Sequence, residues 1–337
     1  MSLFFKRRTG AVTISCAVLF TATAVAGTVG LAGSSGAATG PTLAAAAFEG
    51  APIGFGAGTT GGAAGSTVTV TSIDALTAEA SSVGAKTIRI SGIIRGTDQI
   101  YVTSDKTIVG VGANSGLVGA GFFVKKAHNV IIRNVKISFS PAPVDLIQIQ
   151  KSDHVWIDHN ELFNDTTHDK DYYDGLVDIN HGSTDITVSW NKLHDHFKGS
   201  LVGHSDKNGA EDATIRVTYH HNWFNNVGSR LPRVRFGTVH VYNNLFENAT
   251  TSGIHCVMGA QCLVQNTVFR NVNLPIWTTE DSPQDGYAVQ SGNDFGGSTP
   301  VITQQGSFTK PPYTFTMDAT ATVAATVQSG TGTGKVG

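Results

Sequence analysis

The sequence predicts an all-β protein folded as a β-solenoid, in which short strands stack coil upon coil. Only 14% of its 337 residues are charged and 39 are glycine, a composition typical of short strands joined by many turns. From about residue 128 the chain repeats one pattern: an alternating strand, an asparagine and a second short apolar run. The asparagines at this place are Asn134, Asn160, Asn191, Asn222, Asn244 and Asn266.

The spacing of these asparagines, 22 to 31 residues, suits one coil of a solenoid. Stacked asparagine side chains can hydrogen-bond along the solenoid axis and satisfy the carbonyl groups of the turns. The longer steps then contain insertions, and the loops of neighbouring coils gather on one face. A β-sandwich also has short alternating strands, but it does not explain an asparagine at the same place in each segment.

The first residues have the pattern of an export signal. Lys6, Arg7 and Arg8 precede an apolar stretch of small residues. We expect residues 1–38 to be a signal peptide and small-residue segment, residues 39–47 a flexible linker, and residues 48–337 the solenoid domain. A membrane anchor is the rival interpretation, but so many small residues make a weak span. The sequence therefore predicts a secreted, extracellular protein with no membrane contact after signal removal.

The early part of the domain should hold one short helix among strands. Residues 73–82 are rich in alanine and predict a helix, with Thr71 or Ser72 as its N-cap. The alternating segments around it predict strands over residues 66–71, 86–94, 107–111 and 116–124.

Three acids form the first candidate site. Asp174 and Asp178 are four residues apart, so within a strand they would point to the same side. Asp145 lies about one repeat earlier and can stack beside them. Carboxylates without cysteine or histidine suit a hard cation with oxygen ligands, Ca²⁺ first. The alternatives are that these are solvated loop acids, or that Asp178 caps a turn.

A cationic loop forms the second candidate site. Arg230, Arg233 and Arg235 surround Pro232, which stiffens the loop. We expect Arg230 and Arg235 to face a groove and Arg233 to point elsewhere. Arginine forks suit carboxylates, although salt bridges to nearby acids are an equal alternative, and Lys198 could simply be exposed. Together these residues suggest a substrate that carries carboxylates.

Several other functions are disfavoured. A net charge of −2 gives no basic field for nucleic acid. No G-x-S-x-G elbow is present, and the spacing of the clustered histidines matches no zinc-ligand pattern. Cys256 and Cys262 could form a disulfide in an oxidising compartment or be two small buried side chains. The histidines considered are His194, His196, His204, His220, His221 and His240.

Five ordered segments resemble the polysaccharide lyase family that contains pectate and pectin lyases. The likeness runs from about residue 54 to residue 327, and it implies a right-handed parallel β-helix with loops on one face forming the substrate groove. The R-x-P-x-x-R loop is more similar to the pectate lyase branch. The segments are WIDHNELF, DGLVDI, VSWNKLHDHFKGSLVGHSD, VTYHHNWFNN and SRLPRVRFGTVHVYNN.

The resemblance also implies a role for each candidate residue. Arg230 matches the family's catalytic base, and Lys198 and Arg235 match residues that bind the substrate carboxylate. A base must be a neutral guanidine, a form that nearby cations favour because like charges repel. The residues that match the calcium ligands are Asp145, Asp174 and Asp178.

Two positions depart from the family's pattern. Pro143 stands where many pectate lyases have a further acidic ligand, so a backbone oxygen or water would have to complete the Ca²⁺ site. Val257 stands where some members have an arginine, which removes one substrate contact.

The implied function is a Ca²⁺-dependent pectate lyase that degrades plant cell-wall pectin. It would cleave α-1,4-linked polygalacturonate by β-elimination, leave 4,5-unsaturated oligogalacturonates and act as a monomer. A pectin lyase acting on methyl-esterified chains is the nearest alternative, but it needs no metal-binding acids. A polygalacturonase would not need the R-x-P-x-x-R loop. A non-catalytic polysaccharide-binding β-helix would need neither Arg230 nor Lys198.

Overall fold

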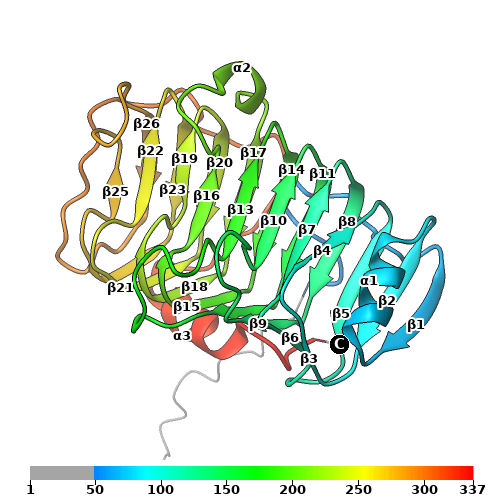
Figure 1. Cartoon of the computed structure of the whole chain (residues 1–337). Coiled ribbons are helices and arrows are strands. Elements are labelled where there is room, and N and C mark those ends of the chain that lie inside the picture. Colours follow the sequence, from blue (N-terminus) through cyan, green and yellow to red (C-terminus); the bar gives the residue numbers. More distant parts are fainter. Residues whose placement is uncertain (1–48, 337) are drawn as a thin grey trace, which may run out of the picture. The chain divides into compact units, whose positions relative to one another are not determined.

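The computed structural model describes residues 49–336, so the predicted signal peptide and linker lie outside the described residues. In the described part, each coil contributes strands to three parallel sheets, which run the length of the solenoid (Figure 1). The predicted parallel β-solenoid is confirmed. In successive coils the chain passes through the sheets in the same order, from a first sheet to a second and then a third.

The first sheet is the largest, with ten strands. It consists of β1 (Ser66–Val70), β2 (Lys86–Ile90), β5 (Lys106–Gly110), β8 (His128–Arg133), β11 (Asp153–Asp158), β14 (Thr184–Ser189), β17 (Arg216–His220), β20 (Thr238–Tyr242), β23 (Gln261–Gln265) and β26 (Tyr287–Ser291).

The second and third sheets have eight strands each. The second consists of β3 (Ile93–Arg95), β6 (Gly116–Val118), β9 (Lys136–Ser138), β12 (Glu161–Phe163), β15 (Lys192–Lys198), β18 (Trp223–Ser229), β21 (Leu245–Ala249) and β24 (Val268–Val272). The third consists of β4 (Gln99–Val102), β7 (Gly121–Lys125), β10 (Ile147–Gln150), β13 (Val177–Asn180), β16 (Ser200–Val202), β19 (Arg233–Arg235), β22 (Ile254–Val257) and β25 (Ile276–Trp277).

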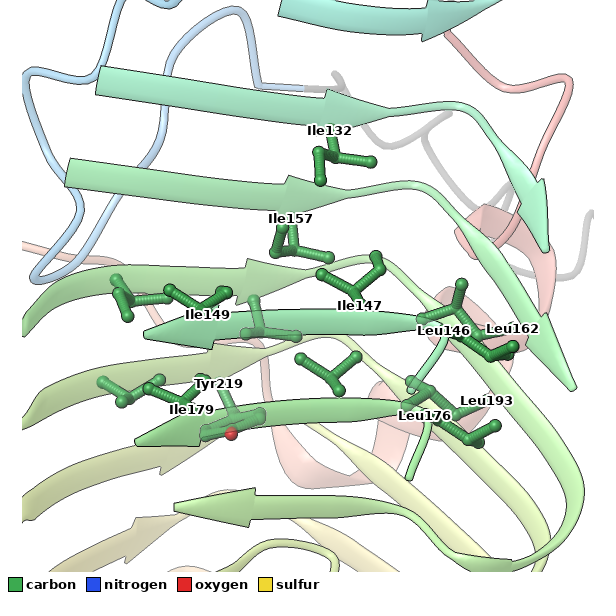
Figure 2. Close-up of a cluster of buried hydrophobic side chains, with 14 of the residues drawn as sticks. Ile132, Leu146, Ile147, Ile149, Ile157, Leu162, Leu176, Ile179, Leu193 and Tyr219 are labelled. Atoms are coloured by element: carbon green, nitrogen blue, oxygen red, sulfur yellow. The ribbon is translucent and has the colours of Figure 1, made fainter. Parts of the chain in front are cut away.

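The core is built from columns of apolar side chains that point into the solenoid. In the first sheet, Ile132 pairs in register with Ile157, and in the third sheet Ile149 pairs with Ile179 (Figure 2). All four side chains are fully buried. Because parallel strands stack without a shift, each apolar residue covers the one below it, and this continuous burial holds the coils together.

The asparagine ladder lies at the turn from the first sheet to the second. The side chain of Asn160 donates to Asn191 Oδ1, that of Asn191 to Asn222 Oδ1, and that of Asn222 to Asn244 Oδ1, each at 3.0 Å. Each acceptor oxygen also takes the backbone N–H of the preceding asparagine. The predicted stacking of asparagines is therefore confirmed for four members.

The two outermost asparagines were assigned to the ladder wrongly. Val135 and Thr267 occupy the end positions, because the backbone N–H of Val135 donates to Asn160 and that of Asn244 donates to Thr267 Oγ1. Asn134 and Asn266 each lie one residue earlier. Their side chains bond instead to Gly110 O and to Asp318 O.

Three helices accompany the sheets. Helix α1 (Ile73–Ser81) packs against β2 and β4, and Ser72 caps it by accepting the N–H of Ala75, as predicted. Helix α2 (Gly209–Asp212) lies between β16 and β17. Helix α3 (Thr320–Gly330) covers the second sheet, where Val323 and Val327 join a small apolar cluster. Among the described residues, no helix is long and apolar enough to cross a membrane.

The structure decides between the two interpretations of the cysteines. Cys256, in β22, forms a disulfide with Cys262, in β23. The bond closes a short loop between the third sheet and the next coil, and both residues are buried.

Candidate active site

A groove of about 330 Å³ lies where the second sheet turns into the third. Residues from several consecutive coils line it, so it follows the direction of stacking. Its charged lining residues are Lys170, Asp171, Lys198, Arg230, Arg233 and Asp281. Two of the predicted site residues, Lys198 and Arg230, therefore face one cavity.

Arg230 is the corner residue between β18 and β19. Its φ of 63° lies in the left-handed region, which bulky side chains seldom adopt. Its carbonyl accepts the N–H of Ser200 at 2.6 Å, and this bond fixes the corner against the preceding coil. The Leu231–Pro232 bond that follows is cis. The hydrogen bond from Ser200 holds the turn in place, and Arg230 lines the groove.

Lys198 is the last residue of β15, one coil before Arg230. Its Nζ lies 3.2 Å from Asp174 Oδ1 and 3.4 Å from Asp171 Oδ1, and its side chain is only 12% exposed. The ammonium group therefore sits between the groove and the acids of the preceding coil.

Asp145 and Asp178 converge on Gly175. The backbone N–H of Gly175 donates to Asp145 Oδ1 at 2.7 Å, and that of Leu201 donates to Asp178 Oδ1 at 3.1 Å. A methyl group on Gly175 would lie 2.3 Å from Asp178 Oδ1 and 3.1 Å from Asp145 Oδ1. The missing side chain of Gly175 leaves the space that the two carboxylates share.

The two acids are buried with little compensating charge. Burial raises the pKa of Asp178 to about 6, and the charge of Asp174 adds to the rise while Arg230 opposes it. Burial and the charges of Asp178 and Asp174 raise the pKa of Asp145 well above its ordinary value. Carboxylates that repel each other in a buried site are stabilised by a cation, and a set of oxygen donors fits Ca²⁺.

The expected strand geometry of the acids was partly wrong. Only Asp178 lies in a strand, because β13 begins at Val177 and Asp174 precedes it in a loop. Asp174 is placed by its neighbours instead. Its carboxylate meets Lys198, and its carbonyl oxygen lies 2.6 Å from His196 Nε2.

The arginines of β19 differ from expectation. Arg233 was expected to point away, yet it lines the groove, and its guanidinium bonds to Asp281 and Ser282. Val234 between the two arginines is buried, so Arg233 and Arg235 both point outward. Arg235 was expected to face the groove, but it is not among the residues that line it; its Nε lies 2.6 Å from Asp206 Oδ1 and its Nη1 lies 3.0 Å from Gly203 O.

His196 is a site residue that sequence reasoning placed only among the turn and core histidines. It lies beneath the acids in β15, and burial lowers its pKa to about 4. A neutral imidazole can donate from Nε2 to the carbonyl of Asp174, which holds this acid in place. Alternation from the core residue Leu193 would have placed His196 on the outer face, and the left-handed φ of Asp195 breaks this alternation and turns His196 inward.

A second group of possible metal ligands lies elsewhere. His128, Asp153 and His154 come together at the starts of β8 and β11, in the first sheet. Both histidine rings contact one carboxylate oxygen of Asp153. This group belongs to a different sheet from the groove.

Comparisons with known proteins show the family of this chain. The family model described as pectate lyase matches residues 9–335. Pectate lyase B of Colletotrichum gloeosporioides is 46% identical over 286 residues, covering 84% of this chain and 86% of that protein. A pectate lyase of Emericella nidulans is 48% identical over 258 residues, covering 75% and 79%.

Solved structures are similar over the same region. A pectate lyase from Bacillus sp. N165, in complex with trigalacturonate, is 32% identical with a TM-score of 0.78, and the match covers 85% of this chain and all of that one. Pectate lyase II from Xanthomonas campestris pv. campestris is 30% identical with a TM-score of 0.73, covering 84% and 98%. Our chain belongs to the pectate lyase family of polysaccharide lyases.

Proposed function

We propose that this protein is a secreted, monomeric, Ca²⁺-dependent pectate lyase that cleaves α-1,4-linked polygalacturonate by β-elimination. The observation that carries the proposal is that Arg230 and Lys198 line one groove, while Lys198 also contacts Asp174, next to the buried acids that share the space at Gly175. The trigalacturonate bound to the related Bacillus enzyme supports the choice of substrate. The signal-like segment at residues 1–38 supports secretion.

Asp145, Asp174 and Asp178 would hold the Ca²⁺ ion. When bound, Ca²⁺ neutralises the buried carboxylates and stabilises the negative charge that develops on the substrate carboxylate. Lys198 lies beside the same acids, so it can bind the uronate carboxylate from the groove side.

The arginines of β19 would extend carboxylate binding along the groove. Arg233 already faces the groove, and its present partner Asp281 is 62% exposed. Arg235 would contact the substrate when a uronate carboxylate replaces Asp206 as its partner. Both exchanges keep the guanidinium paired with a carboxylate, so neither leaves a buried charge uncompensated.

Arg230 would act as the base, in its neutral guanidine form. It takes the proton from C5 of the galacturonate unit, which is acidic because C5 is adjacent to the carboxylate. The electron pair of the broken C–H bond forms the C4–C5 double bond, while the C4–O bond breaks. The leaving oxygen takes a proton from water, and the hydroxide that remains takes the proton from the Arg230 guanidinium, so the base is regenerated and the product has a 4,5-unsaturated end.

The product distinguishes this reaction from hydrolysis. With de-esterified polygalacturonate and Ca²⁺, we expect ultraviolet absorbance from the unsaturated product to rise with time, and a chelator to abolish the rise. New reducing ends without absorbance would instead identify a hydrolase. Equal activity on methyl-esterified pectin in chelator would identify a pectin lyase.

A substitution tests the base itself. Arg230→Lys keeps a cation in the groove but changes the proton-accepting group, and we expect kcat to fall about 10²- to 10⁴-fold. Arg216→Lys, at an exposed position of the first sheet, is the matched control and should keep the full rate. Full activity of Arg230→Lys would remove Arg230 from this role.

A further inference from the structure

One column of outward side chains crosses the whole third sheet. The strand register places one residue of each strand in this column, from β4 at one end to β25 at the other. In order, its members are Tyr101, Phe123, Gln148, Asp178, Leu201, Arg233, His255 and Trp277. The column therefore joins the acid site and the groove to residues that have no part in the proposed chemistry.

The β4 end of the column is aromatic. Tyr101 is 53% exposed, while its neighbours Ile100 and Val102 are buried in the core, so its ring points outward. Phe123 lies next to it with ring centroids 5.2 Å apart. Phe123 does not join the apolar core as Phe122 does, because it lies on the outer face of the sheet beneath Tyr101.

A cation accompanies the two rings. Lys125 is two residues beyond Phe123 in β7, so both side chains emerge on the same face. Its Nζ lies 4.9 Å from the centroid of the Phe123 ring, and Lys125 is exposed. An exposed ring beside an exposed ammonium group can bind a sugar ring through its apolar face and pair with a carboxylate on that sugar.

The position of this aromatic end suits a long substrate. Tyr101 is three strands from Asp178, which corresponds to about 14 Å at the usual strand spacing of a sheet. Gln148 lies between them in the column and accepts a hydrogen bond from Gln99 at 3.1 Å. The column therefore has polar groups between its aromatic end and Asp178. A polymer lying along the groove and the acid site reaches Tyr101 only if it extends beyond the units at the reaction centre.

We propose that Tyr101, Phe123 and Lys125 form a distal subsite that binds one further uronate unit of a long polygalacturonate chain. The proposal rests on the proposed function, because the substrate must occupy the groove at Arg230. Tyr101 supplies the stacking surface, Phe123 supports that ring from below, and Lys125 pairs with the uronate carboxylate. The subsite thus favours long chains over short ones without taking part in the chemical step.

A chain-length series tests the subsite. The KM and kcat of wild-type, Tyr101→Ala and Lys125→Gln enzymes are measured on oligogalacturonates from the trimer to the octamer and on the polymer. We expect each variant to raise KM roughly three- to tenfold on the long chains only, the size of one lost stacking or ion-pair contact, with kcat unchanged. Tyr287→Ala, at a partly exposed tyrosine of the first sheet, is the control and should match wild type.

The outcomes separate the subsite from the proposed function. Wild-type production of unsaturated ends tests the function alone, and its absence would overturn both. If wild type is active but the variants match it at every length, the subsite is wrong and the function stands. An equal rise in KM at every length, trimer included, would also contradict a distal site. Unchanged melting temperatures of the variants check that the fold is intact.

Discussion

The asparagine ladder and the acid site are built by the same geometry but have opposite electrostatics. In both, parallel coils bring polar side chains of neighbouring coils together inside the protein. In the ladder, each amide both donates and accepts, so Asn160, Asn191 and Asn222 satisfy one another. At the acid site, Asp145 and Asp178 can only accept when ionised, and their charges repel. Neighbouring amides can satisfy each other's hydrogen bonds, whereas neighbouring carboxylates repel each other and are stabilised by a cation.

Giving the ladder a carboxylate should produce the largest effect on stability. Asn191→Asp replaces an amide that donates to Ile157 O and to Asn222 Oδ1, so these oxygens would face an unpaired negative charge. We expect the free energy of unfolding to fall by about 3–5 kcal/mol, measured by chemical denaturation. Asn114→Asp, at an exposed asparagine in the turn before β6, is the control and should change stability little. A stable Asn191→Asp protein would show that the ladder's donors are unimportant.

Replacing a carboxylate of the acid site by an amide should stabilise the metal-free protein. Asp178→Asn keeps the acceptor for the N–H of Leu201 but removes a buried charge. Without Ca²⁺ at pH 7, we expect the free energy of unfolding to rise by about 1–3 kcal/mol, because the raised pKa of Asp178 reflects the cost of ionising it. Activity should be lost at the same time. A destabilised Asp178→Asn protein would contradict the account of an uncompensated carboxylate.

Filling the space that Asp145 and Asp178 share at Gly175 should weaken Ca²⁺ binding without changing the stability of the fold. In Gly175→Ala the new methyl group meets the ends of two acid side chains, which can move aside. We expect the Ca²⁺ concentration for half-maximal activity to rise about tenfold, with little change in melting temperature. Gly50→Ala, where a methyl group meets open space, is the control and should change neither quantity. Gly84→Ala is unsuitable as a control because the φ of Gly84 is positive. Unaltered Ca²⁺ dependence of Gly175→Ala would place the ion elsewhere.

The smallest expected effect is on how the stability of the protein depends on pH. The raised pKa of Asp178 means that the folded protein binds more protons than the unfolded chain between about pH 4 and about pH 6. The contribution of Asp178 to stability is therefore lost as pH rises through this window. Buried His196 and His240, with pKa values lowered to about 4, act in the opposite direction.

The difference between wild type and Asp178→Asn isolates the carboxylate from these histidines. We expect the metal-free difference in melting temperature to widen from pH 4 to pH 6 and then level off. Saturating Ca²⁺ should remove the dependence. A difference that stays constant with pH would mean that Asp178 titrates normally in the folded protein.

The solenoid could be predicted from the sequence because the same residue types recur once in each coil. Asparagine recurs at the turn of four successive coils, apolar residues recur at alternate strand positions, and Ser72 is a recognisable helix cap. The exact register was harder to predict, since a shift of one residue exchanges the two faces of a strand. Asn134 and Asn266 were misplaced for this reason, although they stand one residue from the true ladder positions.

The candidate site was predicted in composition but not in arrangement. Arg230, Lys198 and the acids were named from motif and spacing, yet the orientation of a corner side chain depends on backbone angles that the residue type does not determine. The left-handed φ of Arg230 and the buried Val234 together turn Arg233 into the groove. The role of Gly175, which leaves space for Asp145 and Asp178, could not be predicted either, because it depends on how Asp145 aligns with the next coil.

Calorimetric titration of Ca²⁺ into the metal-free protein tests the central claim most directly. Wild type and Asp178→Asn are compared at pH 8, where the carboxylates are ionised. We expect one Ca²⁺ to bind wild type and the affinity of Asp178→Asn to be at least about tenfold weaker. Equal binding by the two proteins would contradict the claim that Asp145, Asp174 and Asp178 hold the ion.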